Sequence, residues 1–253
     1  MPIHFTLSPE TRGALTVHRI EGAVDLNVDA FITDRFGGVS EGPYESLNLG
    51  DHVGDDSAHV QENRRRVAQA AGVEQLVIMR QVHGDTVLDA SDPGVVGEGD
   101  GLFCSSSDLA LAILVADCVP VLLVDETSQD FAVVHAGWRG LRSGVLARAV
   151  ARFGNPATLH AFLGPAISGQ HYQVGPEVAT NFADVPGAVR HDAGDRSLLD
   201  LRRVGAFQLR QLGLGETNVL VSDQSTDGGG HFFSDRAARP CGRFALVARR
   251  VVA

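Results

Sequence analysis

Long runs of apolar residues occupy the centre of the chain. Residues 109–116, 119–124 and 131–134 contain almost no polar side chain, which is typical of strands that are buried on both faces of a sheet. Shorter runs, bounded by turn-forming residues, predict further strands at 27–33, 75–80, 86–90, 159–163, 217–221 and 244–252. The chain is therefore expected to be rich in buried strands.

Helical patterns are fewer. Asp55 or Asp56 can cap a helix that runs to about Ala71, and Asp200 can cap another that runs to about Leu212. Residues 141–153 predict a third helix and 176–182 the start of a fourth. Because strands outnumber helices and do not alternate regularly with them, the pattern predicts an α+β fold with mixed sheets and covering helices. No linker or repeat interrupts the chain, so we expect a single domain over residues 1–253.

Composition narrows the class of protein. Of the 253 residues, 44% are hydrophobic and 21% are charged, as in soluble globular proteins. The formal net charge of -10 repels nucleic acid and anionic lipid, so we expect neither nucleic acid nor a membrane as a partner. The three cysteines show no paired spacing, and the N-terminal residues lack a signal-peptide pattern. We expect a cytoplasmic protein that is a monomer or a small homo-oligomer.

Three residues at the ends or bends of predicted strands can hold a metal ion. They are His83, Cys118 and His135, separated by 118 − 83 = 35 and 135 − 118 = 17 positions. Two imidazoles and a thiolate suit zinc, and three protein ligands leave a fourth position open, as in catalytic sites. The spacing matches no local zinc motif, so Cys118 as a buried apolar residue and His83 as a turn residue stay open as alternatives. His171 is the competing ligand.

Other polar residues stand next to the same strands. A strand, a glycine turn at 136–140 and a helix start place backbone N–H groups around the turn, which suits an anion. Arg35 and Arg139 lie beside glycine turns and are candidate phosphate or ribose contacts, although each can also be a surface cation. Asp117, between two apolar strands, can orient a zinc ligand, relay protons or be a paired structural carboxylate.

Eight motifs give the chain a resemblance to a known family. They occur in the order RFGGVS at 35–40, SLNL at 46–49, QVHG at 81–84, ADCVPV at 116–121, HAGWRG at 135–140, GPAI at 164–167, YQVG at 172–175 and FSDR at 233–236. Together they resemble the laccase-domain or multicopper polyphenol oxidase family, which is now mostly described as zinc-dependent purine nucleoside phosphorylases. The resemblance extends over about residues 32–245.

The resemblance implies a four-layer α/β/β/α sandwich and zinc bound by His83, Cys118 and His135. It also implies phosphorolysis of adenosine, inosine, guanosine and methylthioadenosine, with adenosine deamination as a second activity. Purine nucleosides and phosphate are then the partners. Asn48 and Gln81, which lie within two of the motifs, are expected to contact substrate together with Arg35 and Arg139.

The chain departs from the family pattern only outside the zinc motifs. Asp34 stands where threonine is frequent, and Ser225-Thr226 replaces a Cys-Thr pair. Residues 233–236, FSDR, replace Tyr-Ser-Tyr-Arg, and the segment that follows, with Cys241 before Gly242-Arg243, is altered. These departures concern substrate preference and the C-terminal wall of the pocket.

Three other functions remain as alternatives. Copper-dependent polyphenol oxidation would use a His₂Cys site with a weak axial ligand such as methionine, and the chain has only Met1 and Met79. A metal-free hydrolase would use Cys118 as nucleophile and His135 as base. The third alternative is an accessory protein that edits peptidoglycan precursors.

Overall fold

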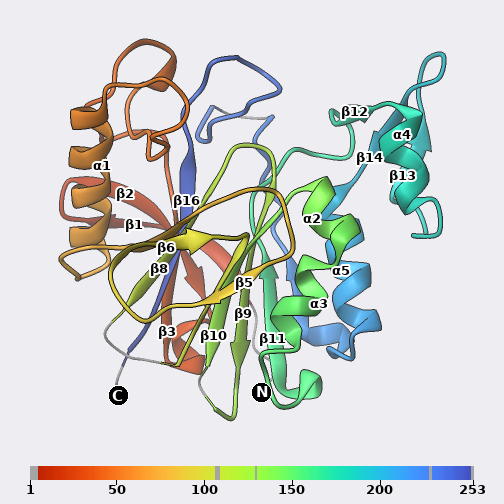
Figure 1. Ribbon diagram of the computed structural model, residues 1–253, viewed down its shortest axis with the longest axis horizontal. Coiled ribbons are helices and arrows are strands. Elements are labelled where there is room, and N and C mark those ends of the chain that lie inside the picture. Colours follow the sequence, from red (N-terminus) through yellow and green to blue (C-terminus); the bar gives the residue numbers. More distant parts are fainter. Residues whose placement is uncertain (1–4, 106–108, 129, 228–229, 252–253) are drawn as a thin grey trace.

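Two sheets packed face to face, with helices outside both, form a four-layer sandwich (Figure 1). The computed structural model describes residues 5–105, 109–128, 130–227 and 230–251. Helix α1 (Ser57–Ala70) covers the first sheet, and helices α2 (Trp138–Ser143), α3 (Val145–Val150) and α5 (Leu201–Gln211) cover the second. The predicted α+β class and the α/β/β/α layering are confirmed.

The first sheet has seven strands and is mixed. Strand β4 is parallel to both β6 and β8, and the other pairs are antiparallel. The strand order is β1 (Thr6–Arg12), β2 (Leu15–Glu21), β3 (Val28–Thr33), β16 (Phe244–Arg250), β8 (Ala110–Val115), β4 (Val77–Arg80), β6 (Gly94–Glu98).

The second sheet has six strands and is also mixed. Strands β15 and β11, and β5 and β7, are parallel pairs, whereas β10 is antiparallel to both of its neighbours. The strand order is β15 (Val219–Val221), β11 (Leu159–Leu163), β9 (Val119–Asp125), β10 (Phe131–Ala136), β7 (Gly101–Cys104), β5 (Val87–Asp89).

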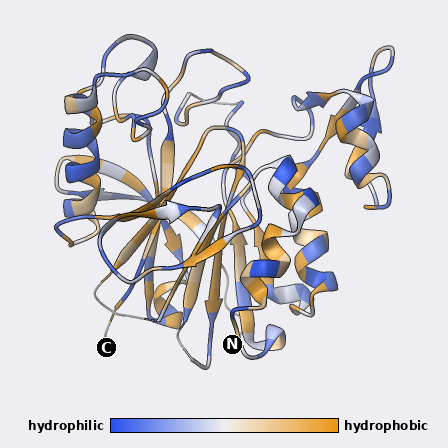
Figure 2. Cartoon of the chain, viewed as in Figure 1, coloured by the Kyte–Doolittle hydropathy of each residue, from blue (hydrophilic) through white to orange (hydrophobic). Residues whose placement is uncertain are grey.

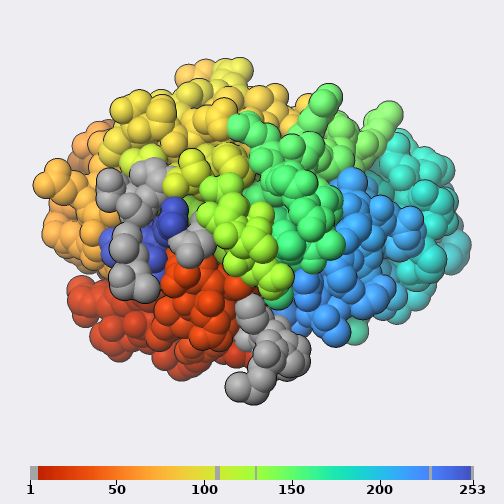
Figure 3. Space-filling model, turned by 90° about the horizontal axis from the view of Figure 1, so that it is seen from below, coloured from red at the N-terminus to blue at the C-terminus, as the bar shows by residue number. Residues whose placement is uncertain are grey.

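A small third sheet extends the molecule beside the second. It is formed by β12 (Gln173–Val174), β14 (Ser197–Leu199) and β13 (Val189–His191), and α4 (Pro176–Ala179) packs on it. Its apolar side chains join the cluster beneath α3 and α5, and in Figure 3 these residues, in cyan, lie directly against the blue surface of α5. The third sheet therefore shares its core with the sandwich.

The core between the two sheets is continuous, because successive side chains of a strand point to opposite faces. Leu111 and Ile113 of β8 pack in one cluster with Leu122 of β9 and Phe162 of β11. The alternate residues of the same strands pack under the helices. Figure 2 shows the apolar strands between helices whose outer faces are hydrophilic.

Most predicted elements are present, with corrected boundaries. The helix predicted over 141–153 is two helices, α2 and α3, separated at Gly144, whose φ of +89° glycine adopts readily. The last predicted strand ends at Arg250, and Val252 lies outside the described residues. Strands β1 and β2 carry many polar residues and were not predicted. None of the described helices has the length and apolarity needed to cross a membrane.

Asn63 ties α1 to the loop that contains the first two sequence motifs. Its side chain is fully buried, accepts a hydrogen bond from the Val39 N–H at 2.9 Å, and donates to the Asn48 carbonyl at 2.9 Å, the Ser40 hydroxyl at 2.8 Å and the Ser46 carbonyl at 3.1 Å. The loop contains a 3-10 turn at Gly42–Tyr44 and a few backbone hydrogen bonds of its own, and this buried amide ties both ends of the loop to α1.

The Asn63→Ala variant is expected to lower the free energy of unfolding by about 2–3 kcal/mol, because buried partners of the amide lose their hydrogen bonds. Chemical denaturation measures this loss. Gln61→Ala, at an exposed position of the same helix, is the matched control and should change stability by less than about 0.5 kcal/mol. Equal effects of the two substitutions would contradict the assignment.

Candidate active site

The three predicted metal ligands converge at one end of the sandwich. His83 follows β4, Cys118 lies in the turn between β8 and β9, and His135 lies at the end of β10. Their ligand atoms all lie within 4.8 Å of one another, and the two imidazole rings are nearly perpendicular, with centroids 4.8 Å apart. His135 is buried, Cys118 is half-buried and His83 is exposed. The cluster is therefore accessible from the side of His83.

Two residues of this region have backbone conformations that non-glycine residues rarely adopt. The φ angles of His83 and Asp117 are 59° and 81°. Each conformation positions a candidate metal ligand: His83 is itself a candidate, and Asp117 directly precedes Cys118. Such conformations persist when surrounding contacts hold them, and hydrogen bonds to two carboxylates supply those contacts.

The first of these carboxylates belongs to Asp100, which is fully buried. Its Oδ1 lies 2.8 Å from His135 Nδ1 and accepts the His83 N–H at 2.9 Å, while its Oδ2 accepts the Gly84 N–H at 2.6 Å. Because Nδ1 of His135 is engaged by Asp100, its Nε2 is left for the metal site. A carboxylate behind a ligand imidazole is a common outer partner in zinc sites.

The second carboxylate belongs to Asp117. It accepts hydrogen bonds from the Thr226 hydroxyl at 2.5 Å and from the Arg236 N–H at 2.7 Å, and its own carbonyl accepts the Ile167 N–H at 3.1 Å. These contacts match the predicted alternative of a paired structural carboxylate. They join the turn that carries Cys118 to the C-terminal loop.

Gly137 is the residue that allows the ligands to approach one another. A Cβ at this position would lie 2.9 Å from Cys118 Sγ and 3.1 Å from His83 Cδ2. A side chain there would force the sulfur or the imidazole to move. The HAGWRG motif therefore has glycine at position 137 because the backbone there passes too close to Cys118 and His83 for a side chain.

The charges within the cluster favour an ionised thiol. Burial raises the pKa of Cys118, but the adjacent His135 and His83 outweigh burial and lower it to about 6. Burial lowers the pKa of His135, but Cys118 and Asp100 outweigh burial and raise it to about 9. A thiolate and two imidazoles within 4.8 Å form a donor set that fits zinc.

A pocket of about 270 Å³ opens over the cluster. Its wall carries four arginines against two aspartates, so it has a positive balance that suits an anionic ligand. The lining residues are His52, Gln81, His83, Leu114, Val115, Ala116, Asp117, Cys118, His135, Trp138, Arg139, Tyr172, Asp235, Arg236, Arg239 and Arg243.

Of the four predicted substrate contacts, Arg139 and Gln81 line the pocket and the other two do not. Arg139 is exposed on the pocket wall, with its guanidinium 4.4 Å from the Trp138 ring. Gln81 also lines the pocket, but its amide exchanges two hydrogen bonds of 2.7 Å with the Leu114 backbone.

Arg35 and Asn48 do not line the pocket. Arg35 donates to the Glu45 carbonyl at 2.9 and 3.0 Å and lies over the Phe233 ring. Asn48 is fully buried and accepts the Arg243 N–H at 2.8 Å. Their contacts hold loops together. The competing ligand His171 pairs with Asp227 and is not one of the pocket residues.

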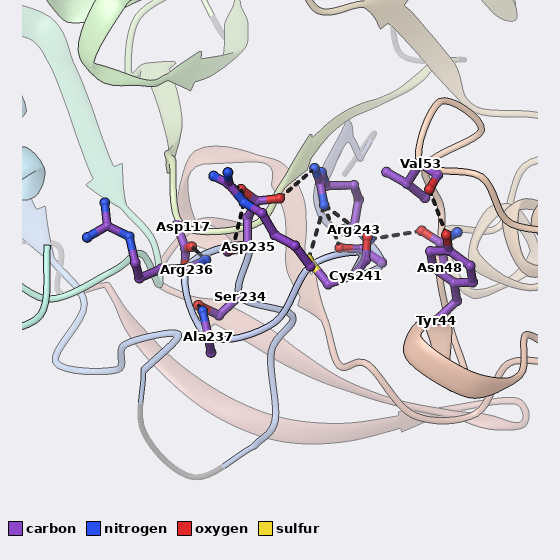
Figure 4. Close-up of polar contacts among 12 residues, drawn as sticks. Tyr44, Asn48, Val53, Asp117, Ser234, Asp235, Arg236, Ala237, Cys241 and Arg243 are labelled. Atoms are coloured by element: carbon purple, nitrogen blue, oxygen red, sulfur yellow. Dashed lines mark hydrogen bonds and ion pairs between the residues drawn. The ribbon is translucent and has the colours of Figure 1, made fainter.

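The departures from the family pattern pointed to a C-terminal wall of the pocket, but the three arginines of this wall were not predicted as site residues. Asp235 pairs with Arg239 at 2.5 Å and with Arg243 at 3.3 Å. Arg236 donates to the Gln173 carbonyl at 2.9 Å, and in Figure 4 its side chain points away from Arg243. The FSDR motif contained two of these residues, but their partners lie elsewhere in the sequence. Tyr172 belongs to the YQVG motif but was not predicted to line the pocket.

Comparisons with known proteins agree with the predicted resemblance. A family described as "Multi-copper polyphenol oxidoreductase laccase" matches residues 29–250. A protein of Mycobacterium tuberculosis strain H37Rv named purine nucleoside phosphorylase is 40% identical over 235 residues, covering 89% of this chain and 93% of its own length. The Escherichia coli K12 protein named purine nucleoside phosphorylase YfiH is 37% identical over 230 residues, covering 86% and 92%.

Solved structures have the same fold. YlmD from Geobacillus stearothermophilus superposes with a TM-score of 0.91 at 30% identity, covering 98% of this chain and all of its own. A Neisseria meningitidis protein, NMB0706, gives a TM-score of 0.83 at 33% identity, covering 89% and 95%. The predicted resemblance is therefore confirmed over nearly the whole chain.

The Asp100→Asn variant is expected to weaken zinc binding by roughly 10–100-fold, as loss of an outer partner of a ligand typically does. The amide group cannot accept all the N–H donors that now meet the carboxylate. Competition with a zinc chelator measures the affinity. Asp85→Asn, whose carboxylate pairs with Arg148, is the control and should bind zinc as the parent does. Unchanged affinity in Asp100→Asn would contradict the role of the carboxylate.

Proposed function

The chain belongs to the multi-copper polyphenol oxidoreductase laccase family, and from this premise we propose that it is a zinc-dependent purine nucleoside phosphorylase. The observation that carries the proposal is a His₂Cys donor set at the base of an arginine-rich pocket. Relatives that share more than a third of the residues are named purine nucleoside phosphorylases. The proposed substrates are adenosine, inosine, guanosine and methylthioadenosine, together with phosphate.

The pocket offers suitable contacts for both substrates. In phosphorolysis, phosphate attacks the anomeric carbon of ribose and the purine leaves, so an enzyme must hold an anion next to the glycosidic bond. Arg139 is the guanidinium of the wall best placed for this, because it is exposed and makes no hydrogen bond or ion pair with another described residue, whereas the other three wall arginines are each engaged. Trp138 and Tyr172 offer aromatic surfaces for the purine.

Tyr172 can also act as a hydrogen-bond donor. Burial raises its pKa to about 12, and Cys118 adds to this effect. The phenol therefore keeps its proton at neutral pH and can donate it to a substrate oxygen or nitrogen. The guanidinium of Arg236 lies 5.0 Å from the centre of its ring and restrains it from one side.

His83, Cys118 and His135 would hold zinc, which supplies Lewis-acid chemistry next to the nucleoside. We extend the proposal to adenosine deamination as a second activity, because a pocket that admits a purine beside such a centre also admits water. Cytoplasmic location belongs to the same proposal.

The copper-oxidase alternative is less well supported by the side chains. Met79, a candidate axial ligand, is buried in the core between the sheets and does not line the pocket. Met1 lies outside the described residues. The metal-free alternative, with Cys118 as nucleophile and His135 as base, predicts activity that survives zinc removal. Peptidoglycan editing predicts turnover of cell-wall precursors in place of nucleosides.

Cys118→Ala is expected to lose zinc and nucleoside turnover together while the protein stays folded, because the thiolate supplies the negative charge of the donor set. Zinc content, turnover of adenosine and circular dichroism are measured on the same preparation. Cys104→Ala is the control: Cys104 lies in the core between the sheets, away from the pocket, and its loss should leave zinc content unchanged. Full zinc and full activity in Cys118→Ala would overturn the proposal.

Arg139→Ala is expected to raise the KM for phosphate by roughly 10–100-fold, since a hydrogen bond to a charged group contributes about 1.5–3 kcal/mol. Arg35→Ala, which removes a cation away from the pocket, should keep the KM of the parent. Mass spectrometry of a nucleoside mixture with and without phosphate identifies the products after anaerobic purification. Free purine and ribose 1-phosphate that form only with phosphate support phosphorolysis, and turnover independent of phosphate contradicts it.

A further inference from the structure

A second cluster of metal-ligand side chains lies away from the pocket. It consists of His18 in β2, Asp34 directly after β3, and His231 in the C-terminal loop, whose ligand atoms all lie within 4.8 Å of one another. None of the three lines the pocket that contains Cys118. From this juxtaposition we propose that the chain holds a second divalent transition-metal ion at His18, Asp34 and His231.

The distances suit such an ion. His231 Nδ1 lies 3.0 Å and His18 Nε2 lies 3.4 Å from the same atom, Asp34 Oδ2. Zinc bonds of roughly 2.0–2.1 Å at tetrahedral angles separate two ligand atoms by roughly 3.3 Å. A cation between the three atoms therefore needs only small side-chain movements.

His18 supplies an independent observation. The residue is only 9% exposed, and its Nε2, which faces the carboxylate of Asp34, has no hydrogen-bond partner among the described residues. A buried polar atom without a partner is unfavourable. A bound cation would satisfy this nitrogen and the charge of the buried carboxylate at once.

The surroundings hold the ligands in place. Asp34 Oδ1 accepts the Phe36 N–H at 3.3 Å, and this leaves Oδ2 directed at both imidazoles. The Arg35 N–H donates to the His231 carbonyl at 2.9 Å and so keeps the C-terminal loop beside the end of β3. The His231 side chain is more than half exposed, which leaves a path for the ion from solvent.

Two imidazoles and one carboxylate form a donor set that differs from the one in the pocket. It lacks a thiolate, and such nitrogen and oxygen ligands suit zinc, iron(II) and related first-row cations. Asp34 lies one position before the RFGGVS motif, and His18 and His231 lie outside all eight motifs.

Zinc alone is the probe, and equilibrium dialysis followed by elemental analysis gives the number of ions per chain. The parent protein is expected to bind two zinc ions, and Cys118→Ala is expected to keep one. Asp34→Asn, which retains the size of the side chain, should bind one zinc ion fewer than its parent in both the wild-type and the Cys118→Ala background. His231→Ala, at an exposed position, should have the same effect with little risk to folding.

His191→Ala is the matched control, because His191 is an exposed histidine outside both clusters. It should bind as many zinc ions as the parent. Folding of each variant is verified by circular dichroism. The proposal is overturned if folded Asp34→Asn and His231→Ala bind as much zinc as their parents. If Asp34→Asn and His231→Ala each bind one zinc ion fewer than their parents, the proposal is supported. This holds even if the zinc content of Cys118→Ala shows that the pocket cluster binds no zinc.

Discussion

The carboxylate of Asp100, buried between the turn after β4 and the end of β10, accepts hydrogen bonds from both of the segments that carry the ligand histidines. Its contact with His135 Nδ1 orients that imidazole, and its contacts with the His83 and Gly84 N–H groups hold a turn of unfavourable φ. One buried charge therefore fixes two of the three candidate ligands, and its burial is tolerated because its oxygens meet several donors. The geometry of the cluster therefore depends on the Asp100 carboxylate.

Asp117 performs the corresponding task for the third ligand. Its backbone has a positive φ, and its carboxylate is held by Thr226 and by the Arg236 N–H. The turn that presents Cys118 is thus anchored to the C-terminal loop, which also supplies the arginine wall of the pocket. Residues more than a hundred positions apart in the sequence are linked in this way. The ligand cluster and the wall form one hydrogen-bonded unit.

The sequence predicted the central strands well, because residues such as those of β8 and β9 are buried on both faces and leave an uninterrupted apolar run. Strands β1 and β2 were not predicted, because their many polar residues interrupt the apolar pattern that indicates a strand. Asp100 was missed because its role depends on His135, which lies 35 positions later. Asn48 was placed in the pocket by its motif, whereas its amide holds the backbone of Gly50 and Arg243. A motif identifies residues that matter but does not separate contact with substrate from support of the loop.

The balance of charge on the pocket wall bears on where an anion binds. Asp235 pairs with Arg239 and Arg243, so two of the four guanidinium groups already face a carboxylate. Arg236 is engaged by the Gln173 carbonyl and by the Tyr172 ring. Arg139, in the HAGWRG motif at the start of α2, lies over the Trp138 ring and forms no ion pair within the described part of the chain. The positive potential that remains unpaired is therefore concentrated near α2 and Cys118, where a phosphate would also lie next to the metal ligands.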